Sequence, residues 1–277
     1  MSKRKAPYRH KDGSACWTKN CTRDVPRPVR TIPVRNVNGL STYQTEQIGI
    51  SAEVAIADAF NVPITDAYRG RGVDKIYSQL TPLVKKVLND ANVPKPVAHI
   101  AEGGNPVDFM LEGDKTLSVK TNMRNGSMIA PQVIGQPTAS VFWQKFPELI
   151  PSSIDLNSMP YEEQAKLFKV AALANADRML TKYWGNLFDC DYLVYTNNIV
   201  DRYDEISSAP NTKIYSKANP PVFDVSKISF TQDLSTWNES NTIKYDGIAI
   251  GEWQIHSNRD CFKFRFNLKG LEKAGLL

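Results

Sequence analysis

Residues 106–122, PVDFMLEGDKTLSVKTN, contain two short segments in which apolar residues alternate with other residues, separated by the tetrapeptide EGDK. Alternation with a period of two is typical of strands with one buried face, and EGDK has the composition of a tight turn. We therefore predict a β-hairpin. In such a hairpin Ser118 and Lys120 project to the same side of their strand, and Asp108 on the first strand can point into a pocket shared with Lys120.

Helical spacing precedes and follows this hairpin. Residues 41–61 place Glu46 and Glu53 on one helix face, two turns apart. Residues 73–90 are also helical, and Thr81 with Pro82 suggests a new N-terminus that divides this region in two. The strongest helix is predicted over 160–188, and β-branched and aromatic segments follow it at 191–200, 225–232, 245–255 and 261–268. The predicted fold class is α/β, with a mixed central β-sheet flanked by helices.

The positive charge is concentrated at the N-terminus. Residues 1–36 hold ten Lys and Arg against two Asp, a net of +8, so the rest of the chain has a net charge of −3 in a total of +5. We predict a basic, irregular N-terminal arm over 1–40 and a single α/β domain over 41–277. A basic arm suits a polyanion such as nucleic acid, and a disordered solubilising tail is the alternative reading.

Cysteine content and hydropathy suggest the compartment. Four cysteines in 277 residues are too few and too scattered for a disulfide framework. No apolar run approaches the roughly 20 residues that span a bilayer. We expect a cytoplasmic protein without membrane contact.

The residue types in the predicted hairpin suit phosphodiester hydrolysis. Asp108 offers a hard oxygen ligand for Mg²⁺, the Val119 carbonyl offers a second, and Lys120 is a cation that can orient and help deprotonate a water. An exposed ion pair between Asp108 and Lys120 is the structural alternative.

PVDF followed by SVK resembles the signature of the PD-(D/E)xK nucleases, in which a Pro-Asp pair precedes an acid, any residue and lysine. The chain departs from the pattern twice, because Val107 separates Pro106 from Asp108 and Ser118 stands where an acid is usual. The resemblance implies a restriction-endonuclease-like core with catalytic Asp108, Lys120 and Ser118. It also implies that a helical glutamate supplies the second carboxylate and metal ligand, and Glu53 is preferred over Glu46.

Two further segments extend the resemblance to type II restriction endonucleases. SVKTN followed by PQVIGQPT is similar to enzymes that cut short palindromes, including those specific for GGCC, and the end of the chain resembles small restriction enzymes with a Gln-bearing strand and a base-reading loop. Amide and guanidinium groups can bond base edges and phosphates. The predicted DNA contacts are Asn122, Arg124, Asn125, Gln132, Gln136, Gln254, His256, Asn258, Arg259 and Lys263.

The N-terminal segment YRHKDGSACWTKNC places His10, Cys16 and Cys21 close together, which permits a structural Zn²⁺ site if a fourth ligand is found. Free or buried thiols in a basic arm are the alternative.

Together these features predict a Mg²⁺-dependent type II restriction endonuclease. It would act on double-stranded DNA as a homodimer matched to a palindrome, leave 5′-phosphate ends, and work beside a cognate DNA methyltransferase. The alternatives are a repair or junction-resolving nuclease and a non-catalytic DNA-binding protein.

Overall fold

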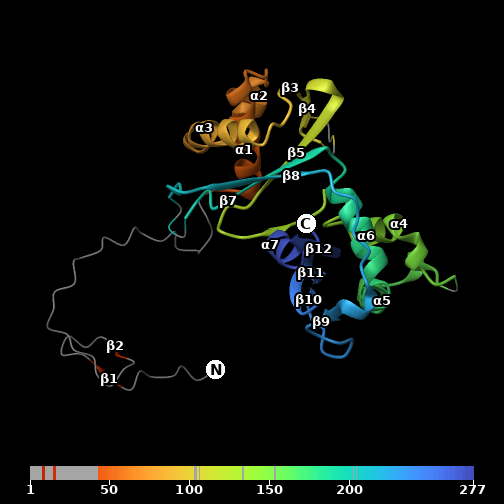
Figure 1. The fold of residues 1–277 in the computed structure, drawn as a ribbon. Helices are drawn as coiled ribbons and strands as arrows, with labels where there is room; N and C mark the ends of the chain where they lie inside the picture. The colour runs from red at the N-terminus through yellow and green to blue at the C-terminus, as the bar shows by residue number, and fades with distance from the viewer. Residues whose placement is uncertain are drawn as a thin grey trace. The chain divides into compact units, whose positions relative to one another are not determined.

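A computed structural model of the 277-residue chain describes residues 43–102, 105, 107–132, 134–152, 154–201, 203 and 205–277, with the backbone alone at 157. It also gives the backbone of a short antiparallel pair, β1 (Tyr8–Arg9) and β2 (Ala15–Cys16). The chain divides into two units, residues 1–40 and residues 41–277. The second unit holds both large sheets and every α-helix that the structure describes (Figure 1).

The α-helices of the second unit fall into an N-terminal group, a central group and one C-terminal helix. In chain order they are α1 (Thr45–Phe60), α2 (Asp66–Arg69), α3 (Asp74–Asp90), α4 (Ala139–Lys145), α5 (Tyr161–Ala174), α6 (Ala176–Leu187) and α7 (Leu268–Lys273). Short 3₁₀ turns lie at Glu112–Asp114, Pro147–Leu149, Leu156–Ser158, Val225–Lys227 and Ser257–Arg259.

The first five-stranded sheet has the order β3-β4-β5-β7-β8, from β3 (Pro96–His99), β4 (Phe109–Leu111), β5 (Lys115–Thr121), β7 (Tyr192–Asn197) and β8 (Asn211–Ser216). Only β5 and β7 run parallel, so the sheet is mixed. Helices α1 and α3 cover one face, where Ile48, Ile56, Leu117 and Val194 share one core (Figure 1).

The predicted β-hairpin is confirmed. Strands β4 and β5 pair antiparallel with Phe109 opposite Leu117 and Leu111 opposite Lys115. The turn between them needs positive φ at Gly113 (71°) and Asp114 (57°), and these are residue types that reach the left-handed region at low cost. The turn chemistry therefore fixes the register that brings Asp108 beside Ser118.

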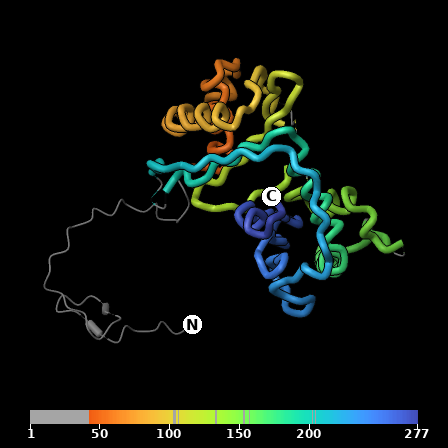
Figure 2. The backbone as a smooth tube through the Cα atoms, viewed as in Figure 1, coloured from red at the N-terminus to blue at the C-terminus, as the bar shows by residue number. Residues whose placement is uncertain are grey.

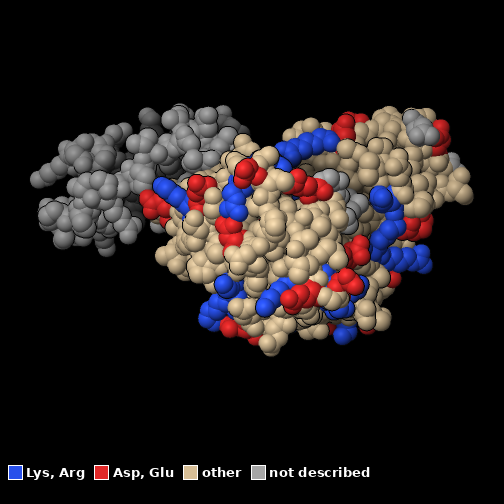
Figure 3. All heavy atoms as spheres, turned by 90° about the horizontal axis from the view of Figure 1, so that it is seen from above, with Lys and Arg blue, Asp and Glu red and all other residues tan. Residues whose placement is uncertain are grey.

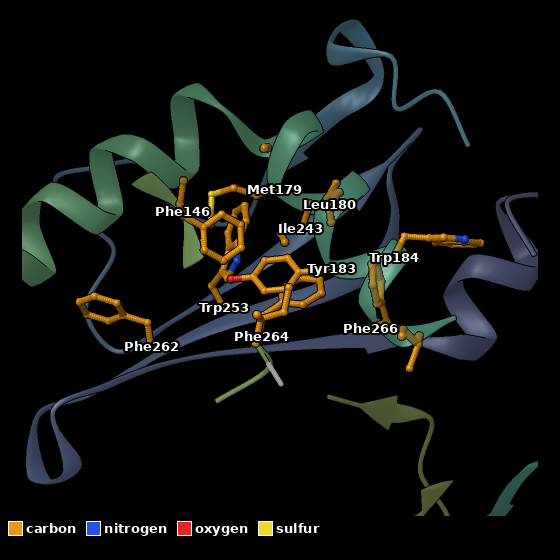
Figure 4. Close-up of a cluster of buried hydrophobic side chains, with 14 of the residues drawn as sticks. Phe146, Met179, Leu180, Tyr183, Trp184, Ile243, Trp253, Phe262, Phe264 and Phe266 are labelled. Atoms are coloured by element: carbon orange, nitrogen blue, oxygen red, sulfur yellow. The ribbon is translucent and has the colours of Figure 1, made fainter. Parts of the chain in front are cut away.

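The second five-stranded sheet is antiparallel, with the order β6-β12-β11-β10-β9. Its strands are β6 (Met128–Ile129), β9 (Ile228–Phe230), β10 (Ser240–Tyr245), β11 (Ile248–His256) and β12 (Cys261–Asn267). One face packs an aromatic cluster against α4, α5 and α6, in which Trp253, Phe264 and Tyr183 are fully buried (Figure 4). Truncating one such ring to alanine costs about 3–5 kcal/mol.

Residues 127–132 and 134–139 lie along the outer edge of β12, between the two sheets in the chain. Backbone N–H groups of Leu268, Phe264 and Phe262 donate to the carbonyls of Ser127, Gly135 and Pro137, and the Ala139 N–H donates to Asp260. The tube in Figure 2 shows this segment leaving β5 and passing beside the C-terminal strands. We call residues 127–139 the edge segment.

The prediction of a single central sheet is wrong. The strands after residue 225 are joined by short turns, so they pair with one another and form a sheet of their own. Strands β3, β8 and β10 were not predicted, and the segment 245–255 contains a hairpin turn. Asp246 and Gly247 both have positive φ, at 47° and 78°, and Asp-Gly is a strong hairpin signal.

Two helix boundaries also differ from the prediction. The region 73–90 is one continuous helix, α3, with Pro82 inside it. The hydroxyl of Thr81 donates to the carbonyl of Tyr77, so Thr81 bonds the preceding turn and does not cap a new one. The region 160–188 is two helices, because Asn175 leaves helical geometry (φ −130°, ψ 33°) and its backbone and side-chain N–H groups both donate to Ala171.

Basic and acidic side chains are interspersed on the face seen from above in Figure 3, and neither sign forms a continuous patch there. This agrees with the net charge of −3 over residues 37–277, obtained as 24 Lys and Arg against 27 Asp and Glu. Within the described residues, no helix combines the length and apolarity needed to cross a bilayer.

Candidate active site

Asp108 lies at the start of the hairpin, buried at 6% exposure. Its backbone N–H donates to Leu117 (3.0 Å) and its carbonyl accepts from Ile100 (2.9 Å), so its backbone is fixed from both neighbouring strands. Its Oδ2 accepts the Val119 N–H at 2.5 Å, and the Ser118 hydroxyl also bonds this carboxylate. The hairpin therefore holds the carboxylate rigidly against β5.

Glu53 projects from the middle of α1 and is also buried, at 8% exposure. Its Oε2 accepts the hydroxyl of Tyr68 at 2.6 Å and lies 2.9 Å from Nε2 of His99. Glu53 is close enough to Asp108 to raise its pKa, so two carboxylates from separate elements meet here. Glu46, the other carboxylate on the same helix, forms an exposed ion pair with Arg71.

Lys120 lies on β5 two residues beyond Ser118, and its Nζ contacts Oε1 of Gln132 in the edge segment. It interacts electrostatically with Asp108, as the hairpin prediction requires. Ser118 is buried at 3% exposure beside Asp108, and Val119 supplies both the N–H bound to Asp108 and a backbone carbonyl. The structure thus brings together Asp108, Glu53, Ser118, Val119 and Lys120.

Burial shifts the pKa values of several residues in this site. Burial, and then the charge of Glu53, raise the pKa of Asp108 to about 6, although Lys120 and the Val119 N–H oppose the shift. Burial lowers the pKa of Lys120, and Asp108 opposes that change. Burial and the bond to Glu53 raise the pKa of Tyr68, which keeps its hydroxyl a donor. Perturbed groups of opposite charge in one site are typical of catalytic centres.

The donor set fits a hard, water-rich cation. The described residues contain no group of three or more His, Cys, Asp and Glu side chains arranged to hold a metal. Two carboxylates with a backbone carbonyl match Mg²⁺, which keeps several waters and is held by one or two carboxylates in proteins. The same set lacks the sulfur and nitrogen ligands typical of structural zinc.

The predicted DNA contacts after the hairpin fall into three groups. Asn122 is used structurally, because its Nδ2 donates to Met128 and to Tyr195. Gln132 and Gln136 lie in the edge segment, where Gln136 bonds the Cys261 thiol. Arg124 and Asn125 precede the edge segment, and Asn125 accepts from Lys269 at 3.4 Å.

The C-terminal DNA-contact candidates share one face of the β11–β12 hairpin and its turn. Gln254 pairs in register with Lys263, and His256 with Cys261. Oε1 of Gln254 lies 3.3 Å from Nε2 of His256. Asn258 and Arg259 are exposed in the 3₁₀ turn that closes the hairpin. Burial, and then the charges of Lys263 and Arg259, lower the pKa of His256.

The zinc prediction lies outside the described side chains. His10 and Cys21 are not described, and Cys16 is described only as backbone in β2.

Sequence reasoning missed Tyr68 and His99, the two partners of Glu53. Tyr68 follows a Thr65 N-cap in the four-residue helix α2, and His99 ends the short strand β3. A lone histidine in PVAHI and a tyrosine in a short polar helix carry no recognisable motif. Only the packing of α1 against these elements brings them together.

An α/β fold with two carboxylates and a lysine converging at a mixed sheet is compatible with a nuclease. The chain is similar to the type II restriction enzyme CviAII of Paramecium bursaria Chlorella virus 1, with 28% identity over 224 residues. The matched region is 80% of this chain and 58% of the relative, so the chain spans a little over half the length of that protein. No family model matches the chain, and no solved structure matches it.

Proposed function

We propose that the protein is a type II restriction endonuclease that hydrolyses double-stranded DNA at a short palindrome. The observation that carries this proposal is the meeting of Asp108, Glu53 and Lys120 at one buried site. The similarity to a type II restriction enzyme over 80% of the chain supports the same class independently. A GGCC target, a homodimer and a cognate methyltransferase belong to this proposal as expectations.

In the proposed mechanism, Asp108, Glu53 and the Val119 carbonyl would hold Mg²⁺. A bound Mg²⁺ would supply Lewis-acid stabilisation of the charge that develops on the phosphate oxygens. Ser118 and the Val119 N–H fix the Asp108 carboxylate, so that it needs little reorganisation during the reaction.

Lys120 acts on the attacking water. Burial lowers the pKa of Lys120, which makes loss of its own proton easier. Lys120 can then orient the water and, in its neutral form, accept a proton from it. Gln132 accepts a hydrogen bond from the Lys120 amine through its Oε1. In-line attack of the water oxygen on phosphorus then breaks the bond to the 3′ oxygen. The departing 3′ oxygen takes a proton from solvent, which leaves a 5′-phosphate and a 3′-hydroxyl.

Digestion of a long, unmethylated DNA of known sequence in Mg²⁺ tests the proposal, with sequencing of the fragment ends. Asp108→Ala and Lys120→Ala should abolish cleavage. Matched controls are Asp90→Ala and Lys115→Ala, which remove exposed side chains that form ion pairs with Lys86 and Asp191. Discrete fragments with one shared palindrome at their ends, lost only in the first two variants, would support the proposal.

The alternatives give different results. A junction-resolving or repair nuclease would cut branched or damaged DNA and leave linear duplex intact. A non-catalytic binding protein would bind DNA equally well in EDTA and leave every substrate intact.

A further inference from the structure

Glu53 is a buried carboxylate on a helix whose neighbouring positions are almost entirely apolar or small. A carboxylate in such a place is costly unless hydrogen bonds compensate for its lost hydration. Tyr68 and His99 supply that compensation, and both act on the same oxygen, Oε2. Among the described residues, no hydrogen bond to Oε1 is found.

The two donors are themselves held in place. The Tyr68 backbone N–H donates to the Thr65 hydroxyl at 3.2 Å, and the Arg71 guanidinium lies 5.2 Å from the Tyr68 ring centroid. The His99 ring packs edge-on against Tyr68 at 4.7 Å and against Phe109 at 5.1 Å. Neither donor can move without disturbing a packed neighbour.

The strands that hold Asp108 also hold His99. His99 pairs directly with Phe109, the residue after Asp108, and Ile100 donates to the Asp108 carbonyl. Helix α1 contributes Glu53, α2 contributes Tyr68 and β3 contributes His99, and these elements lie together beside β4 (Figure 1). The position of Glu53 is therefore tied to that of Asp108 through two fixed donors.

We propose that Tyr68 and His99 are positioning residues that fix Oε2 of Glu53 and leave Oε1 as the oxygen offered to a divalent cation shared with Asp108. This inference rests on the proposed function, because it takes Glu53 and Asp108 as cation ligands. His99 acts through its Nε2–H donor. Outer hydrogen-bond partners of metal ligands commonly change metal affinity by roughly 10- to 100-fold.

The experiment measures Mn²⁺ binding to the full chain by electron paramagnetic resonance, in which the signal of free Mn²⁺ is lost on binding. This readout needs neither DNA nor turnover. Tyr68→Phe removes one oxygen, and His99→Leu removes the imidazole donor. Both should weaken Mn²⁺ binding by roughly 10- to 100-fold. His99→Gln keeps an N–H near the position of Nε2 and should restore most of the affinity.

Tyr77→Phe is the matched control, because it removes a hydroxyl that donates to Asp74 at the exposed start of α3 and leaves the packed ring in place. It should leave Mn²⁺ binding unchanged. Thermal unfolding in EDTA checks that each variant folds. If His99→Leu does not fold, Tyr68→Phe alone decides the question, since the ring and its packing remain.

Glu53→Gln separates this inference from the proposed function. If Glu53→Gln weakens Mn²⁺ binding while Tyr68→Phe and His99→Leu leave it unchanged, the positioning role is refuted and the cation site stands. If Glu53→Gln also leaves binding unchanged, Glu53 is not a ligand and the assignment of Glu53 in the proposed mechanism fails as well.

Discussion

Replacing Asp108 by asparagine is expected to stabilise the protein at pH 8 in the absence of divalent cations. Burial, opposed by Lys120, raises the pKa of Asp108 from 3.8 to about 6. Each pKa unit corresponds to about 1.4 kcal/mol between the two protonation states, so the ionised form costs about 3 kcal/mol of folding free energy. Asparagine has nearly the same shape as aspartate, and its side-chain oxygen can accept the Val119 N–H without carrying a negative charge.

The pH dependence follows from the direction of this shift. Because the folded-state pKa lies above the unfolded value, the folded protein binds the proton more tightly. The stability that comes from this tighter proton binding is fully present below the pKa of Asp108 in the unfolded chain. It is lost as the pH rises through the folded-state pKa of about 6. The wild type should therefore match Asp108→Asn near pH 4, and the variant should become the more stable by up to about 3 kcal/mol at pH 8.

Urea unfolding of both proteins in EDTA, repeated from pH 4 to pH 8, measures the difference directly. Subtracting the two free energies of unfolding removes the contributions of groups that titrate alike in both proteins. A difference that stays constant over this range would refute the account of Asp108 as a destabilising buried charge.

Four other changes have defined outcomes. Arg259→Ala should reduce the difference in binding free energy between target and non-target DNA by about 1–3 kcal/mol, measured by competition binding. An equal loss of affinity for both DNAs would indicate that Arg259 contacts phosphate and not a base. Gly270→Ala should lower the midpoint of thermal unfolding sharply, because the added Cβ would lie 1.9 Å from the Ala249 carbonyl oxygen. In Gly185→Ala, by contrast, the added Cβ meets nothing within 4 Å, so this substitution should stabilise α6 by up to about 1 kcal/mol. Deleting residues 1–40 should weaken DNA binding and flatten its dependence on salt, and an unchanged slope would exclude phosphate contacts by the arm.

The β4–β5 hairpin can be predicted because the residues that specify it lie within the hairpin itself. Alternating apolar residues, a Gly-Asp turn and a short connection specify the pairing of β4 with β5 without reference to the rest of the chain. The same local rules predict helix α1. Asp108, Lys120 and Glu53 can therefore be identified as candidate site residues from the short segments that contain them.

The surroundings of these residues depend on long-range packing, which sequence patterns do not record. Tyr68 and His99 approach Glu53 from 15 and 46 residues away, and Gln132 reaches Lys120 through the edge segment. The separation into two sheets depends on pairings between strands far apart in the sequence, such as β5 with β7. The break at Asn175 arises from a side chain that competes for a backbone carbonyl.

The parallel pairing of β5 with β7 has a consequence for how the protein matures. Strand β5 ends at Thr121, whereas β7 begins at Tyr192, so the strand that carries Lys120 gains its inner neighbour only after about 70 further residues. Chains are synthesised from the N-terminus at roughly 5–20 residues per second. A ribosome-bound chain that ends before β7 holds Asp108 and Lys120 on an incomplete sheet. We expect such nascent chains to lack the fixed geometry that the proposed hydrolysis needs, which would protect nearby DNA until β7 has been synthesised.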